Sequence, residues 1–95
     1  MPTYCLELYL PRVTAAQLEE EARQARLAAE AIATNGILVH YLRTTYLAED
    51  ETCFHLFEAN SAEDVAEAAR RAGLPSERIT LAVEAVAATA RKGCG

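Results

Sequence analysis

The sequence has no excess of basic side chains. Lys and Arg total 9 against 14 Asp and Glu, and the formal net charge is −5. Nucleic acids and anionic membrane surfaces are bound through a basic face, so we expect neither as the main partner. An acidic surface is compatible with cation binding but does not by itself predict it.

Long apolar segments are also absent. None approaches the roughly 20 residues that a transmembrane helix requires, so no membrane span is expected. The start, from Met1 to Tyr4, lacks the basic region and apolar run of a signal peptide. Both absences favour a cytoplasmic protein.

Catalytic and redox motifs are missing as well. The three cysteines, Cys5, Cys53 and Cys94, form no CxxC pair, and no disulfide is expected in a reducing compartment. Serine occurs only at Ser61 and Ser76, which are expected starts of a helix and a turn, so no nucleophile–base pair is predicted. There is no phosphate loop and no GxGxxG. These absences leave no catalytic residue to predict from a motif.

What is present is a regular succession of apolar periods in a chain of single-domain size, so we predict one domain over residues 1–95. Alternation predicts strands at 3–10, 37–47, 52–59 and 78–84, and helical periods predict helices from Thr14 to Asn35 and from Ser61 to Gly73. The order βαββαβ predicts an α+β, ferredoxin-like sandwich with a four-stranded antiparallel sheet and both helices on one face. We expect the tail from about residue 85 to continue the strand, to form a short helix or to be loose, with 93–95 loose.

The predicted hairpin of strands 37–47 and 52–59 holds the side chains that could bind a metal or take part in a reaction. Closing it around Glu49 and Asp50 places alternate residues on opposite faces. We expect one set beneath the helices: His40, Leu42, Thr44, Tyr46, Cys53, His55, Phe57 and Ala59. We expect the other set on the open face: Val39, Tyr41, Arg43, Thr45, Phe54, Leu56 and Glu58. The inward apolar residues of the first strand are Tyr4, Leu6, Leu8 and Leu10, and those of the last are Ile79, Leu81 and Val83.

An open sheet face with exposed Phe54, Leu56 and Val39 invites association, so we predict a homodimer whose open sheets pack together. Its interface could enclose a pocket for a small molecule. An Arg among carboxylates and phenols can bind an anion or polarise a carbonyl, or can form a structural ion pair. The predicted pocket residues are Glu7, Tyr9, Tyr41, Arg43 and Glu58.

His55, Cys53 and His40 are the candidate ligands for a transition metal, because imidazole and thiolate suit nickel, zinc or copper. His40 is predicted to lie too far from Cys53 to share an ion within one chain. The alternative is a structural core histidine beside an inert thiol. The acidic turn 49–51 could attract a hard cation or simply be solvated.

Two long runs, YLRTTYLAEDETCFHLFEA and SAEDVAEAARRAGLPSERI, resemble a family of small bacterial proteins named for a nickel-binding member. The start, MPTYCLELYLPRVTAAQLEEEA, also fits that family's opening strand and helix. The resemblance spans Pro2 to about Glu84 and implies the ferredoxin-like fold, homodimers of the α+β-barrel kind and nickel or another transition metal as ligand. The family commonly has cysteine at the position of His55, and a histidine of some relatives corresponds to Ala68 or Ala69, so the resemblance supplies no complete ligand set.

Three functions follow from these observations. The leading prediction is a cytoplasmic homodimeric binding protein for a transition metal, favoured over an enzyme without excluding one. The competing prediction is a cofactor-free enzyme for a small carbonyl or aromatic compound, with Arg43 as electrophilic clamp and Glu7 or Glu58 as base. The third is a structural or regulatory dimer without a ligand. A hollow pocket around Arg43 would favour the enzyme.

Overall fold

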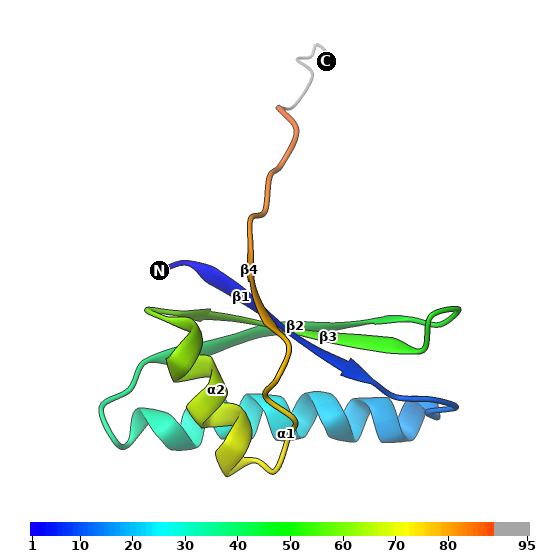
Figure 1. The fold of residues 1–95 in the computed structure, drawn as a ribbon, viewed down its shortest axis with the longest axis horizontal. Coiled ribbons are helices and arrows are strands. Elements are labelled where there is room, and N and C mark those ends of the chain that lie inside the picture. Colours follow the sequence, from blue (N-terminus) through cyan, green and yellow to red (C-terminus); the bar gives the residue numbers. More distant parts are fainter. Residues whose placement is uncertain (89–95) are drawn as a thin grey trace.

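The computed structural model describes residues 1–88, and its elements follow the predicted order (Figure 1). The expectation for residues 93–95 lies outside the described residues. The elements are β1 (Thr3–Tyr9), α1 (Ala15–Ala33), β2 (Val39–Leu47), β3 (Thr52–Ala59), α2 (Ala62–Arg71) and β4 (Ile79–Ala82).

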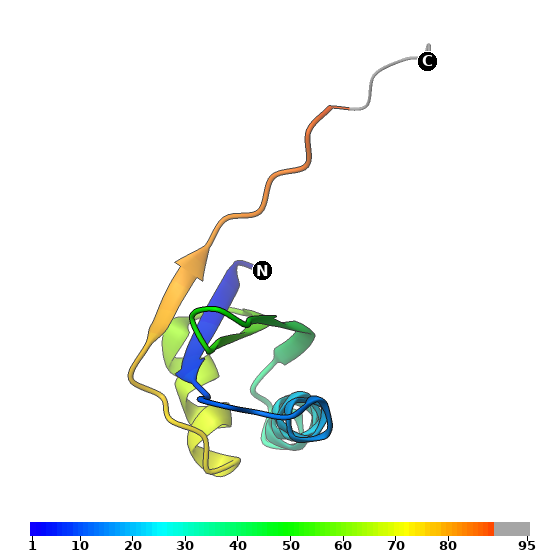
Figure 2. The same ribbon diagram turned by 90° about the vertical axis from the view of Figure 1, so that its right-hand side faces the viewer.

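The strands form one antiparallel sheet in the order β2-β3-β1-β4. Both helices cover one face of this sheet, and the other face is open (Figures 1 and 2). This arrangement confirms the predicted ferredoxin-like fold. Neither helix in the described range is long and apolar enough to cross a membrane.

The predicted helix signals act as the sequence indicates. The Thr14 amide donates to Gln17 Oε1 at 2.9 Å, and the Gln17 amide donates to Thr14 Oγ1 at 3.1 Å, which closes the capping box at the start of α1. Gly73, with φ +74°, follows α2 in the left-handed conformation that glycine adopts without strain.

The core lies between the sheet and the helices, and the helices contribute mainly small residues to it. Leu6, Ile32 and Phe57 are the largest apolar side chains that are fully buried. The buried alanines of the two helices allow both helices to approach the sheet closely. They are Ala25, Ala28 and Ala29 of α1 and Ala66, Ala68 and Ala69 of α2.

Strand β4 is shorter than predicted. It ends at Ala82, and the chain then leaves the sheet on the side away from the helices (Figure 1). Leu81, within β4, and Val83, beyond its end, were both predicted to point inward, but they are 57% and 87% exposed. The residues that follow, 83–88, are neither strand nor helix.

A β-bulge in β2 interrupts the register that the sequence predicts. From the turn to Thr44 the pairs are as expected, with Tyr46 opposite Cys53 and Thr44 opposite His55. The next residues are irregular, and Leu42, predicted to pair within the core, is the residue left without a partner. An extra residue of this kind reverses the facing of the side chains that precede it.

The reversal moves three predicted side chains to the opposite face. Tyr41 pairs with Phe57 and joins the helix side, whereas the sequence predicted it on the open face. His40 pairs with Glu58 and is exposed, so its predicted place beneath the helices is wrong. Val39, predicted on the open face, is 5% exposed and belongs to the core.

The acidic turn after β2 has a structural contact that the sequence did not suggest. Glu51 Oε2 accepts from the Arg12 amide at 2.8 Å, and Glu51 Oε1 accepts from the Tyr9 hydroxyl at 3.3 Å. The Leu10 amide also donates to the Glu51 carbonyl at 2.8 Å. Glu51 thus ties the β1–α1 connection to the hairpin.

Replacing Glu51 with Ala is expected to lower the free energy of unfolding by about 1 kcal/mol, because a carboxylate–backbone hydrogen bond is lost. Urea unfolding would measure this change. Glu49→Ala, in the same exposed turn, is the matched control and should change stability by less than about 0.5 kcal/mol. Equal losses in the two variants would contradict the assigned contact.

Candidate functional site

Within residues 1–88, His55 is the polar side chain that lies in the fully buried core. Strand β3 points it toward the helices. His55 Nδ1 lies 2.7 Å from Thr44 Oγ1, and that oxygen lies 2.6 Å from the Tyr41 hydroxyl. The bulge in β2 brings Tyr41 into this series of hydrogen bonds. Its ring also packs edge-on against Phe57, with the ring centroids 5.9 Å apart.

The other ring nitrogen of His55 faces two further candidate ligands. Cys53, two residues away on the same strand face, places Sγ 3.8 Å from His55 Nε2. Glu21 of α1 places Oε1 3.9 Å from the same nitrogen. Glu21 Oε1 is buried and has no hydrogen-bond partner in the described part of the chain.

The sequence reasoning missed Glu21, although a signal was present. Glu21 lies three residues after Leu18 and four before Ala25, and this spacing places all three on one helical face. That face is the apolar stripe of α1 that packs on the sheet. A carboxylate within a buried stripe is costly unless it has a partner, which marks it as a candidate site residue.

Burial sets the protonation of this cluster. Desolvation lowers the pKa of His55 to about 4, so the ring is neutral at pH 7 and its contact with Glu21 is not an ion pair. Desolvation, and then the charge of Glu21, raise the pKa of Cys53 to about 11, so the thiol is protonated. Desolvation and the nearby charge of Glu20 also raise the pKa of Glu21 above its usual range. A neutral imidazole therefore lies beside a thiol and a carboxyl group.

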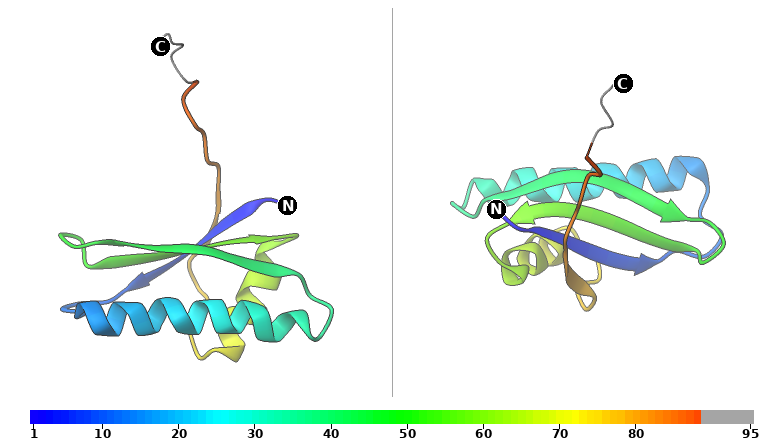
Figure 3. Two further views of the ribbon diagram at one scale, coloured as in Figure 1. Left: turned by 180° about the vertical axis from the view of Figure 1, so that it is seen from behind. Right: turned by 90° about the horizontal axis from the view of Figure 1, so that it is seen from above.

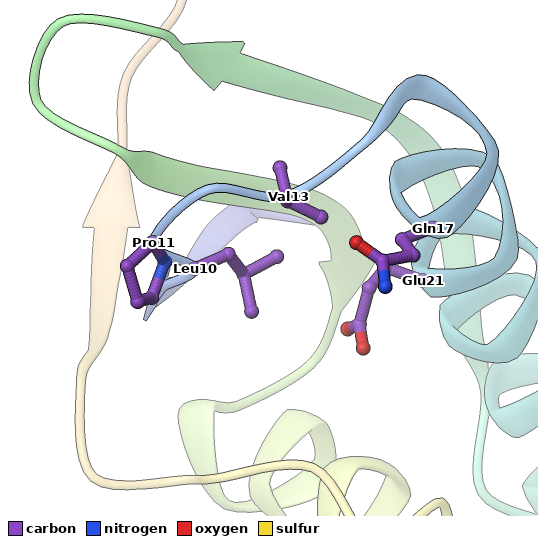
Figure 4. Close-up of a pocket in the computed structure, with 5 residues that line it drawn as sticks. All are labelled: Leu10, Pro11, Val13, Gln17 and Glu21. Atoms are coloured by element: carbon purple, nitrogen blue, oxygen red, sulfur yellow. The ribbon is translucent and has the colours of Figure 1, made fainter.

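A pocket of about 300 Å³ opens next to this cluster, between the β1–α1 connection and α1 (Figure 4). Gln17 and Glu21 project into it from the helix. Glu21 both lines the pocket and reaches toward His55, so an entering ligand meets Glu21 before it meets the ring. The lining residues are Leu10, Pro11, Val13, Gln17 and Glu21.

The spacing of the donor atoms is close to that of a small metal site. Bonds of 2.0–2.3 Å to a tetrahedral ion place neighbouring donor atoms about 3.6 Å apart, near the 3.8 and 3.9 Å found around His55 Nε2. The described residues nevertheless contain no closed group of three His, Cys, Asp or Glu side chains around one point. His55, Cys53 and Glu21 thus lie close together without enclosing one point in the described residues.

His40, the third predicted metal ligand, does not join this cluster. It is exposed on the open face opposite Glu58.

The predicted pocket residues are dispersed over the sheet. Arg43 contacts Glu84 Oε2 through its guanidinium, and Glu7 Oε2 lies 3.4 Å from Arg78 Nε. Tyr41 is on the helix side, and the pocket described above lies on that side as well. Tyr9 is bound to the turn, and Glu58 lies opposite His40.

Comparison with known proteins agrees with this architecture. A family model described as nickel-responsive protein, SCO4226-like, matches residues 4–81. The crystal structure of SCO4226 from Streptomyces coelicolor A3(2) superposes with a TM-score of 0.69 at 26% identity, over 88% of this chain and 99% of that one. Among curated proteins none matches this chain. The family match covers most of the sequence, and the chain therefore belongs to the family of nickel-responsive SCO4226-like proteins.

Proposed function

We propose that this protein binds a transition metal ion, with nickel as the first candidate, through His55 Nε2, Cys53 Sγ and the carboxylate of Glu21. The observation that carries the proposal is the buried oxygen of Glu21, which has no hydrogen-bond partner in the described residues and lies 3.9 Å from His55 Nε2. A cation between these groups would satisfy that oxygen. The nickel-responsive description of the family supports the choice of ion.

Each residue has a distinct part in this proposal. Thr44 Oγ1 lies 2.7 Å from His55 Nδ1, and in the metal-bound form it would accept the Nδ1 proton, which leaves Nε2 to coordinate. Cys53 coordinates as a thiolate, so it must release the proton that its raised pKa retains. Glu21 adds a negative charge and connects the site to the pocket. Imidazole, thiolate and carboxylate together form a donor set that suits borderline ions such as nickel and zinc.

Replacing His55 with Ala is expected to weaken nickel and zinc binding by about a hundredfold or more, because the central donor atom is removed. Isothermal titration of metal-free protein would measure the affinity. His40→Ala is the matched control: it removes an exposed imidazole from the other face and should leave the affinity unchanged. Binding weaker than millimolar in the wild type, or equal affinities for wild type and His55→Ala, would refute the site.

Association is the second part of the proposed function: we infer that two copies pack through their open sheet faces. Phe54 and Leu56, two residues apart on β3, lie on the open side of the sheet and are half-buried. No helix covers that side (Figure 2). A small domain also gains most from the additional buried surface. Light scattering at micromolar concentration should give twice the mass of one chain, and a monomer would contradict this inference.

The competing enzyme has less support. Its proposed clamp, Arg43, is paired with Glu84, and its proposed base, Glu7, is paired with Arg78. These contacts do not direct the guanidinium of Arg43 and the carboxylate of Glu7 to one point. We therefore favour a binding protein over a cofactor-free enzyme.

A further inference from the structure

The chain leaves the sheet after β4 as an extended arm, which we define as residues 83–88. Figures 2 and 3 show the arm departing from the face of the sheet that the helices do not cover. Five of its six residues are apolar. Val83 and Val86 are 87% and 95% exposed, so the arm buries almost nothing against its own chain.

Among residues 1–88, an ion pair connects the arm to the sheet. The carboxylate of Glu84 contacts the guanidinium of Arg43, which lies on the open face of β2, opposite Leu56. Both side chains are about half exposed, at 41% and 54%. Exposed ion pairs contribute little to stability, so this pair cannot order the arm by itself. It does show that the negative charge of the arm is complementary to the positive charge of Arg43 on the open face.

The family model covers residues 4–81 and ends two residues before the arm begins. The match to the family model therefore accounts for neither the exposed valines nor the contact between Glu84 and Arg43.

We propose that the arm is exchanged between two copies of this chain, each arm lying along the open face of the other copy. Glu84 would then contact the partner's Arg43, and Val83 and Val86 would cover the apolar strip of Phe54 and Leu56. The proposal rests on the dimer inferred above. A second copy fits the open face better than another occupant. Every chain carries one Glu84 and one Arg43, so a two-fold exchange of arms forms two identical ion pairs together. The exchange also buries apolar surface that both the arm and the sheet leave exposed in one chain.

Charge reversal distinguishes exchange between chains from attachment within one chain. Arg43→Glu and Glu84→Arg, each alone, should weaken self-association about tenfold, because two attractions become two repulsions. The double variant Arg43→Glu/Glu84→Arg should return to the wild-type affinity. An equimolar mixture of the two single variants should also associate at wild-type strength, because every pair between unlike chains is again attractive. Sedimentation equilibrium measures all four samples.

The outcomes separate this proposal from the dimer itself. A mixture as weak as the single variants, beside a restored double variant, would mean that the pair forms within one chain and would overturn the exchange while the dimer stands. Single variants that associate like the wild type would overturn the exchange as well. A monomeric wild type at micromolar concentration would overturn both. Nickel titration of the same variants reads the metal site independently of all these results.

A second pair of substitutions tests the apolar part of the arm. Val83→Asp/Val86→Asp should weaken association at least tenfold and leave the melting temperature of the monomeric protomer unchanged, because both side chains are almost fully exposed in a single chain. Leu38→Asp is the control, since Leu38 is 52% exposed in the α1–β2 connection, and it should associate normally. Unchanged association of the double variant would overturn the exchange.

Discussion

Acidification from pH 7 to pH 4 is expected to destabilise the metal-free protein by up to about 3 kcal/mol through His55 alone. Burial lowers the pKa of His55 to about 4 in the folded chain, whereas an unfolded histidine titrates near 6.5. Between these values the unfolded chain binds a proton that the folded chain does not, so the free energy of unfolding decreases as the pH falls. The contribution is fully present above about pH 6.5.

The neighbours of His55 do not remove this effect. Thr44 and Tyr41 are uncharged, and Cys53 is a protonated thiol throughout the range. Glu21 is the acidic group beside the ring, and burial and then the charge of Glu20 raise its pKa. Its own titration therefore favours the folded chain as the pH falls and offsets part of the His55 effect.

Urea unfolding as a function of pH, with a chelator present, would measure the dependence. His55→Gln should flatten it between pH 4 and 6.5, and His40→Gln, which changes an exposed imidazole, should keep it. An identical slope in His55→Gln and wild type would show that His55 is not a buried neutral ring.

Replacing Phe57 with Ala is expected to cost about 3–5 kcal/mol of unfolding free energy, the range for an aromatic side chain removed from a core. Phe57 is 2% exposed, and its ring meets Tyr41 at 5.9 Å and His55 at 6.5 Å between centroids. Small domains have a total stability of about 5–15 kcal/mol, so the variant should be close to unfolding.

The control for this prediction keeps most of the volume. Phe57→Leu retains an apolar branch in the same space and should cost about 1–2 kcal/mol. Urea midpoints and slopes would give both values. A loss below about 1 kcal/mol in Phe57→Ala would contradict the central position of this ring.

Most of the architecture was predictable because its signals are local. The alternation of Tyr4, Leu6 and Leu8 and the capping box at Thr14 and Gln17 each specify one element without information from the rest of the chain. The element order then leaves few topologies. The prediction for β4 extended too far because Leu81 and Val83 continue the alternation, and no local signal shows where a strand loses its neighbour.

The details of the site were less accessible because two of them depend on tertiary contacts. The bulge at Leu42 has no glycine or other local marker, and the sequence Tyr41-Leu42-Arg43 fits both facings equally well. Reversing the facing at that point exchanged the places of Tyr41 and His40. Glu21 is the last of three consecutive glutamates, and only its position on the apolar stripe of α1 distinguishes it from its solvated neighbours.

In the polar cluster of His55, Thr44 is hydrogen-bonded to Nδ1, and Cys53 and Glu21 face Nε2. The most direct test is X-ray absorption at the nickel edge of the nickel-loaded protein, with Cys53→Ser and His55→Ala as variants. We predict imidazole and sulfur scattering in the wild type, loss of the sulfur in Cys53→Ser and loss of the imidazole in His55→Ala. A spectrum of oxygen neighbours alone, or one that neither substitution changes, would contradict the site.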